Sequence, residues 1–268
     1  MHVQWPNPQN ANVTTGTIVA SQLLAYKGRD DKLFAGAIAE SGSPARLNAL
    51  PTVEDWEPVI ARISDAVGCA NATSAIACLR TVPVEDLNAV LNSTAAQGAG
   101  NGFVLDGDFM VDAPATQLDA GEFVHVPYLI GANSDEGTGF GPSQINTTDQ
   151  FLAYITQSYG IDSGTAQDLA ILYPDIPNIG IPATLPGRPD ASLGLQFKRS
   201  SALATDTSQI APRRFATEMF AKHGVPAYSY RFNVIVNGQT YQYGVTHFQE
   251  VAFVFVSLSN AISPACFC

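Results

Sequence analysis

Residues Val126–Thr138, VPYLIGANSDEGT, decide the fold class of this chain. The first six residues form a short apolar run, which predicts a strand buried in a parallel sheet. The next residues, Ala132–Thr138, predict a polar loop directly after that strand. Functional side chains of parallel sheets collect at the carboxyl ends of the strands, so this loop is a candidate site. Spacing alone leaves three interpretations of an acidic residue in this loop: it is catalytic, it caps the next helix, or it is solvated.

Two further apolar runs, Ala35–Ala39 and Ala227–Phe232, predict strands of the same kind. Helical spacing and end signals predict helices between the strands, at residues 17–28, 53–67, 84–91, 114–120, 149–159 and 210–223. The Pro-rich stretch Tyr173–Arg188 predicts an irregular surface loop. Strands separated by helices indicate an α/β fold with a mainly parallel sheet. Three strands are few for 268 residues.

The composition excludes several classes of protein. Hydrophobic residues make up 46% of the chain, which argues against wholesale disorder. The formal net charge of −11 disfavours binding to nucleic acid or to an anionic membrane surface. The longest apolar run, Val251–Val256, is far shorter than the ~20 residues that span a bilayer.

Other features indicate an extracytoplasmic protein. Cys69 and Cys78 flank a short polar loop, as in a local disulfide. Glycosylation sequons, each a weak three-residue pattern, begin at Asn12, Asn71, Asn92 and Asn146. The N-terminus, MHVQWPNPQN, has no apolar core of a signal peptide. We therefore expect an incomplete chain of a secreted protein.

Four histidines are candidates for acid–base chemistry. His2 lies in an aperiodic stretch, and His125 precedes a strand where a solvated side chain is favoured. His223 ends a helix, where an imidazole satisfies the last carbonyl groups. His247 lies in the loop YGVTHF, between a glycine and an apolar run, and is the strongest candidate.

Six ordered blocks carry a family resemblance: QLLAYKGRDDKLFAGAIAESGSP, CANATSAIACLRTVP, VLDGDFMVDAPATQL, VPYLIGANSDEGTGF, APRRFATEMF and YGVTHFQEVAFVF. Together they span residues 17–255, and in this order they resemble the type B carboxylesterase/lipase family. The resemblance implies an α/β-hydrolase fold. It also implies that the chain holds the C-terminal part of the sheet, with the N-terminal strands missing.

The resemblance assigns roles to particular residues. Glu136 matches the acid and His247 the histidine of the family's Ser–Glu–His triad, in the chain order of α/β-hydrolases. Cys69 and Cys78 match a family disulfide. Asp206 is either a partner behind the triad or a helix cap. Neither a metal nor an organic cofactor is expected.

The nucleophile of the family is not found. No G-x-S-x-G occurs in the 268 residues, and the expected position, Ala11–Thr15, has the sequence ANVTT. Ser41, in AESGS, lacks the flanking glycines and is interpreted as structural. The HGGG-type oxyanion loop is also absent. We expect residues 1–15 and about 257–268, including Cys266 and Cys268, to be non-family sequence.

The sequence therefore predicts a carboxylic-ester hydrolase by family, inactive as the chain stands. An intact relative would be secreted and would act on ester small molecules or lipids. The alternative is a non-catalytic, esterase-like binding or adhesion module, favoured by the absent serine and disfavoured by the retained Glu136 and His247.

Overall fold

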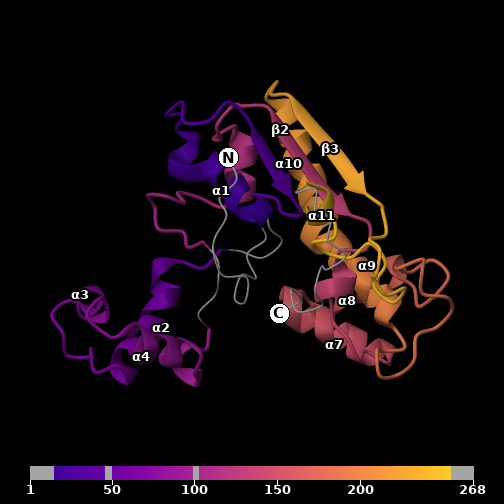
Figure 1. The fold of residues 1–268 in the computed structure, drawn as a ribbon, viewed down its shortest axis with the longest axis horizontal. Helices are drawn as coiled ribbons and strands as arrows, with labels where there is room; N and C mark the ends of the chain where they lie inside the picture. The colour runs from indigo at the N-terminus through magenta and orange to yellow at the C-terminus, as the bar shows by residue number, and fades with distance from the viewer. Residues whose placement is uncertain (1–14, 46–49, 99–102, 255–268) are drawn as a thin grey trace. The chain divides into compact units, whose positions relative to one another are not determined.

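The structure is a computed structural model that describes residues 15–45, 50–98 and 103–254. The chain divides into two compact units (Figure 1). Unit 1 combines residues 1–48 with 114–268, and unit 2 comprises residues 49–113. His2, Asn12, Cys266 and Cys268 lie outside the described residues, as do nearly all of the two ends expected to be non-family sequence. No helix among the described residues is long and apolar enough to cross a membrane.

Unit 1 contains a parallel three-stranded sheet, which confirms the predicted α/β class. Its strands β1 (Ala37–Glu40), β2 (Tyr128–Asn133) and β3 (Ala227–Phe232) are hydrogen-bonded in the order β1-β2-β3. All pairs are parallel. Because the strands are parallel, the segments that follow β2 and β3 leave the sheet at the same edge.

The ends of two strands differ from the prediction. β2 begins at Tyr128 and not at Val126, because Pro127 has no N–H for the ladder. β2 also continues to Asn133, which pairs with Phe232, so the predicted loop 132–138 begins at Ser134. β1 starts two residues later than predicted, with Ala37 donating its N–H to the carbonyl oxygen of Pro127.

Helices α1 and α10 pack against the sheet, and further helices extend beyond it (Figure 1). The α-helices of unit 1 are α1 (Thr15–Gly28), α5 (Pro114–Ala120), α6 (Gly137–Phe140), α7 (Thr148–Tyr159), α8 (Ser163–Leu172), α9 (Phe197–Thr205), α10 (Ala211–Lys222) and α11 (Val251–Val254). A π-helical turn, η2 (Asp206–Ile210), joins α9 to α10, so α10 begins one residue later than predicted. The predicted helix 17–28 is also interrupted, because Ala25–Lys27 are not helical.

The core of unit 1 lies between the sheet and α10. Phe220 of α10 packs on Tyr128 of β2, with ring centroids 4.9 Å apart, and on Phe123 at 4.2 Å. Successive residues of a strand point to opposite faces. Ile38 and Tyr228 come one residue after the strand positions that pair with Tyr128. They therefore point to the sheet face opposite Tyr128, and they are 58% and 62% exposed.

Unit 2 is helical. It contains α2 (Val53–Ala66), α3 (Ala75–Leu79), α4 (Val84–Leu91) and the short 3-10 helix η1 (Thr94–Ala96), of which α2 and α4 were predicted. Thr52 and Asp55 form a capping box at the start of α2. Cys69 and Cys78 form a disulfide between α2 and α3.

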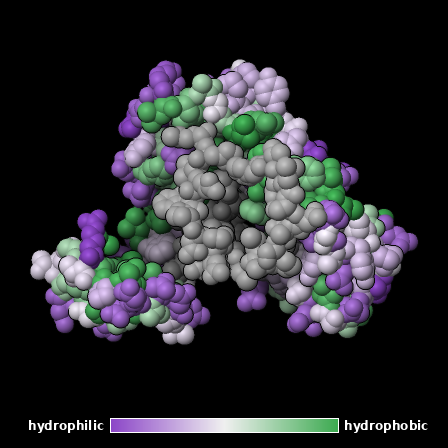
Figure 2. All heavy atoms as spheres, viewed as in Figure 1, coloured by the Kyte–Doolittle hydropathy of each residue, from purple (hydrophilic) through white to green (hydrophobic). Residues whose placement is uncertain are grey.

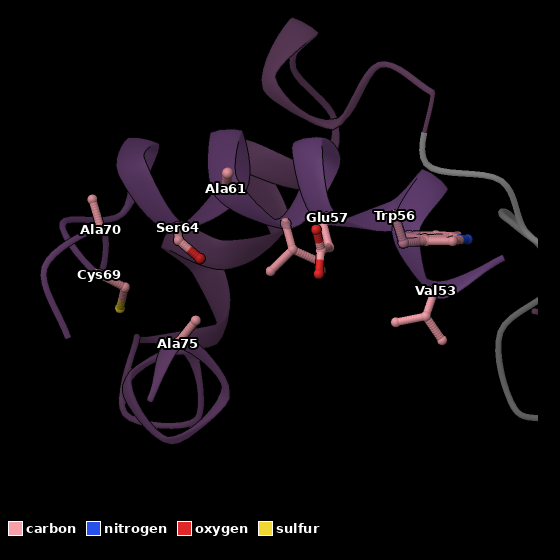
Figure 3. Close-up of a pocket in the computed structure, with 9 residues that line it drawn as sticks. Val53, Trp56, Glu57, Ala61, Ser64, Cys69, Ala70 and Ala75 are labelled. Carbon is pink, nitrogen blue, oxygen red and sulfur yellow. The ribbon is translucent and has the colours of Figure 1, made fainter. Parts of the chain in front are cut away.

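One face of α2 borders a hollow of about 400 Å³ (Figure 3). Trp56, Ser64 and Cys69 line it, and the remaining lining is mostly apolar. Apolar side chains also reach the outer surface of unit 2, as Figure 2 shows in green at its lower left. The apolar residues of the predicted helix 53–67 therefore lie in two stripes. One stripe, with Val59 and Ile63, is buried, and the other borders the partly open hollow.

Candidate functional site

The acidic residue Glu136 lies in the turn between β2 and α6. Gly137, the next residue, donates its N–H to Thr205 Oγ1 at 2.7 Å. A Cβ atom at this position would lie 2.4 Å from the carbonyl oxygen of Ser201, so only glycine fits against α9. This contact holds the turn, and with it Glu136, at the carboxyl end of β2.

His247 lies in the segment that follows β3, and Asp135 ties this segment to the acid turn. The Val245 N–H donates to Asp135 Oδ2 at 2.8 Å, and the Asp135 N–H donates to the Val245 carbonyl oxygen at 3.0 Å. Thr138 Oγ1 adds a bond to the Tyr243 carbonyl oxygen at 2.7 Å. Together these bonds place the two loops side by side.

The result is a direct hydrogen bond between the two predicted site residues. His247 Nδ1 lies 2.5 Å from Glu136 Oε2. The Glu136 side chain is fully buried, whereas that of His247 is 25% exposed. The edge of His247 also contacts Phe140, with ring centroids 5.4 Å apart. Within the described part of the chain, Nε2 of His247 makes no hydrogen bond, so this nitrogen is left for a substrate or a reacting group.

The second oxygen of Glu136 is held from two sides. Glu136 Oε1 accepts the Asn133 N–H at 2.6 Å and the Ser41 hydroxyl at 2.5 Å. Both carboxylate oxygens are therefore bonded, which fixes the carboxylate in one orientation.

A second carboxylate, that of Glu250, lies behind the first. Glu250 Oε2 accepts from Asn133 Nδ2 at 2.5 Å, and Glu250 Oε1 lies 3.5 Å from Ser41 Oγ. Burial raises the pKa of Glu250 above its usual value, although the bond from Asn133 opposes the shift.

These two carboxylates set the charge of His247. Burial alone would lower the pKa of His247, but the hydrogen bond and charge of Glu136, with the charge of Glu250, outweigh it and raise the pKa. The site thus favours the imidazolium, the form that a histidine takes after it accepts a proton.

Ser41 and Asn133 bond to the acid, Glu250 lies behind it, and none of the three was assigned to the site from the sequence. Ser41 was interpreted as structural, and it is only 1% exposed, with its hydroxyl bonded to Glu136 and not to His247. Its φ of 51° turns the side chain under the acid at the end of β1. One available signal was position: Ser41 and Asn133 end neighbouring strands, and Glu250 follows His247 by three residues.

The other sequence candidates lie away from this pair. His223 Nε2 contacts the carbonyl oxygen of Asp119 on α5 at 3.0 Å, not a carbonyl of its own helix, because that helix ends at Lys222. His125 is exposed, with Nε2 3.1 Å from the Gly121 carbonyl oxygen. Asp206 is the C-cap residue of α9, and its side chain accepts from the Tyr173 hydroxyl at 2.7 Å.

The predicted sequons differ in exposure. Asn71 and Asn92 are exposed. Asn146 is half-buried, with Oδ1 accepting the Leu195 N–H at 2.9 Å and Nδ2 donating to the Gln144 carbonyl oxygen at 3.1 Å. Asn92 Nδ2 also donates to the Asn88 carbonyl oxygen at 2.7 Å, so attachment of a glycan requires less rearrangement at Asn71 than at Asn92 or Asn146.

An acid and a histidine joined by a hydrogen bond at the carboxyl edge of a parallel sheet are features of the α/β-hydrolases. Residues 12–262 match the carboxylesterase family, and the chain belongs to that family. The chain is 32% identical to Lipase 2 of Geotrichum candidum, over 73% of this chain and 38% of that protein. It is 29% identical to Secreted lipase 1 of Botryotinia fuckeliana, over 89% of this chain and 42% of that protein.

A solved structure agrees on the fold. The crystal structure of Aspergillus niger EstA matches with a TM-score of 0.71 at 24% identity, over 92% of this chain and 47% of EstA. The chain thus spans less than half the length of each of these relatives.

Proposed function

We propose that this chain carries the acid and the histidine of a carboxylic-ester hydrolase that works through a serine. His247 is the general base and acid, and Glu136 holds its ring and stabilises its charge. The bond of 2.5 Å between His247 Nδ1 and buried Glu136 Oε2 carries this proposal.

The reaction follows from the two nitrogens of His247. Nε2 takes the proton of a serine hydroxyl as the serine oxygen attacks the ester carbonyl carbon, and then gives that proton to the departing alcohol. Water then cleaves the acyl-enzyme by the same route. Glu136 accepts the hydrogen bond from Nδ1 and stabilises the imidazolium.

The nucleophilic serine is proposed to come from polypeptide beyond these 268 residues. Ser41 does not suit this role, because it is buried and its hydroxyl donates to Glu136. We therefore expect the 268-residue chain to be inactive alone. Relatives named lipase and secreted lipase support ester substrates, lipids among them, and a secreted protein.

A fluorophosphonate probe tests the role of the chain. The purified 268-residue protein should remain unlabelled. A longer product of the same gene, extended upstream of Thr17 to include a G-x-S-x-G segment, should be labelled and should hydrolyse p-nitrophenyl butyrate. In that longer protein, His247→Ala should lower kcat by roughly 10⁶-fold.

Two outcomes would reject the proposal. Labelling of the 268-residue protein would place a nucleophile within it. Full activity of the longer His247→Ala protein would remove the histidine from catalysis. A gene without any G-x-S-x-G upstream would favour the non-catalytic module. His223→Ala is the matched control, since that histidine lies against α5 and should leave kcat unchanged.

A further inference from the structure

A second hollow of about 490 Å³ lies in unit 1, next to the acid turn. Ser134 and Thr205, which adjoin or contact that turn, form part of its wall. The rest of the wall, which also includes Tyr173 and Asp206, holds arginines from α9, α10 and β3 and apolar residues from the α8 end and the Pro-rich loop. These are Arg199, Arg213, Arg231, Leu172, Ile179 and Ile181.

Two of the three arginines have donor groups to spare. Arg213 Nη1 donates to the Tyr230 carbonyl oxygen at 2.6 Å, but its Nε is buried without a hydrogen-bond partner. Arg231 donates through Nε to Ser134 Oγ at 2.8 Å. Within the described ranges, neither guanidinium forms an ion pair with a carboxylate. Since each guanidinium has five N–H donors, several remain for a ligand.

Arg199 lines the same hollow, and each of its three guanidinium nitrogens donates a hydrogen bond within the protein. Its three nitrogens donate to the Tyr173 carbonyl oxygen, to Gln196 Oε1 and to the Ala170 carbonyl oxygen, and its plane lies over the Phe151 ring. Arg199 therefore serves the packing of α7 to α9, and the unpaired positive charge comes from Arg213 and Arg231.

The local charge is unbalanced in favour of an anion. Burial lowers the pKa of Arg213, and the positive charges of Arg214 and Arg231 lower it further. The carboxylate of Asp206 also lines the hollow and accepts from the Tyr173 hydroxyl at 2.7 Å, but three guanidiniums against this one carboxylate leave the lining positively charged.

The rest of the wall is apolar and partly uncovered. Leu172 is 72% exposed and Ile179 is 65% exposed, although both border the hollow. An alkyl chain lying along these side chains would remove apolar surface from water.

We propose that this hollow binds an oxyanion that carries an alkyl chain. Its head lies between the guanidiniums of Arg213 and Arg231, and its chain lies along Leu172 and Ile179. Carboxylate and phosphate heads share the required chemistry, because a guanidinium binds either with two parallel hydrogen bonds. The site is separate from the Glu136–His247 pair and does not depend on the proposed esterase activity.

Calorimetric titration of the 268-residue chain tests this site. Sodium decanoate and decyl phosphate are the two probes, and the tighter one identifies the preferred head. Sodium acetate and decanol are the comparison ligands, which lack the chain and the charge. We expect at least one probe to bind about tenfold or more tightly than both comparison ligands.

Arg213→Gln and Arg231→Gln should each weaken that probe by about tenfold. Arg214→Gln is the matched control, because this exposed neighbour on α10 does not line the hollow and should change binding by less than about twofold. Circular dichroism checks the fold of each variant. If Arg213→Gln does not fold, Arg231→Gln alone decides, because that side chain is exposed.

The proposal is overturned if decanol binds as tightly as the charged probes, since the hollow would then be only an apolar surface. It is equally overturned if folded Arg231→Gln binds the probe as the unchanged chain does, or if neither probe binds.

Discussion

Glu136 is fully buried, and its two oxygens accept bonds from His247, Ser41 and the Asn133 backbone. An ionised carboxylate in such a place is tolerated only when it is hydrogen-bonded and charge-compensated. Nearby Glu250 has a bond from Asn133, and burial raises its pKa. The two carboxylates therefore differ in role: one holds the histidine, and the other adds negative charge behind it.

Replacement of Glu250 by glutamine should change how stability depends on pH. Because burial raises the pKa of Glu250 in the folded chain, its ionisation opposes folding. The protonated carboxyl of Glu250 therefore contributes stability. This stability is complete below 4.5, the pKa of the unfolded chain, and is lost as the pH rises through the pKa of the folded chain. Glu250→Gln should therefore flatten the fall in unfolding free energy above that pH, measured by urea denaturation.

The exposed Glu218→Gln on α10 is the control and should leave the pH dependence as it is. A Glu250→Gln chain whose stability still falls as steeply as that of the unchanged chain would contradict the assigned role.

Sequence reasoning selected Glu136 and His247 but not the residues that hold them. Family motifs mark reacting groups, and they do not record which side chains meet across a sheet. Ser41 is 95 residues from Glu136 in the chain, and its contact depends on the parallel pairing of β1 with β2. The bond from Asn133 to Glu250 depends on the segment after β3 in the same way. Contacts of this kind follow from the assembled sheet.

At the scale of elements, the loop that carries His247 depends on one glycine. Gly244 has a φ of +59°, and a Cβ atom there would lie 2.4 Å from Asp135 Oδ2 and 2.6 Å from Pro182 Cβ. The loop therefore approaches the acid turn more closely than a larger residue permits.

Gly244→Ala should destabilise unit 1 more than a comparable change elsewhere. Gly238 supplies the control, because its φ is +87° but an added Cβ would meet nothing within 4 Å. We expect Gly238→Ala to cost about 1 kcal/mol, from the backbone alone. Gly244→Ala should cost roughly 3 kcal/mol, because it also disrupts the bond between Asp135 and Val245. Equal losses in urea denaturation would contradict this account.

The disulfide should stabilise unit 2. Cys69 and Cys78 are nine positions apart, so the bond restricts a short loop of the unfolded chain. The double variant Cys69→Ser/Cys78→Ser should lower the unfolding free energy of unit 2 by about 2–3 kcal/mol. Trp56 fluorescence during chemical denaturation measures the change. Dithiothreitol should lower the stability of the unchanged chain equally, and a difference between the two treatments would reject the loop explanation.

Elements with a clear amphipathic pattern were predicted well, whereas α9 was not predicted. Nearly all of α9 is buried, including the charged residues Lys198 and Arg199, which sequence reasoning places on an exposed face. Lys198 bonds to the Leu185 carbonyl oxygen at 2.8 Å, a contact made by the irregular Pro-rich loop. Such a helix is stabilised by tertiary contacts, which a periodicity argument does not detect.

At the scale of the whole molecule, the chain forms a three-stranded sheet with one apolar row uncovered. Parallel sheets are normally covered on both faces. Ile38 and Tyr228, on neighbouring positions of β1 and β3 across β2, are exposed, and the chain covers 47% of EstA. The isolated chain should therefore associate through this row.

Light scattering coupled to gel filtration measures that association. Ile38→Lys and Tyr228→Lys should each raise the monomer fraction, because a charge on the row opposes burial. Val84→Lys, which removes an exposed apolar residue from unit 2, should not. If the unchanged chain is a monomer at every concentration tested, the prediction is wrong.

The titration of His247, followed by NMR of its ring protons in the 268-residue chain, tests the central claim that Glu136 and His247 form a charge-coupled pair. The account predicts a pKa above the ordinary value of 6.5 in the unchanged chain. In Glu136→Gln the pKa should fall, because the charge of Glu250 alone then opposes the effect of burial. An unchanged pKa in folded Glu136→Gln would contradict the pair and, with it, the proposed catalytic roles.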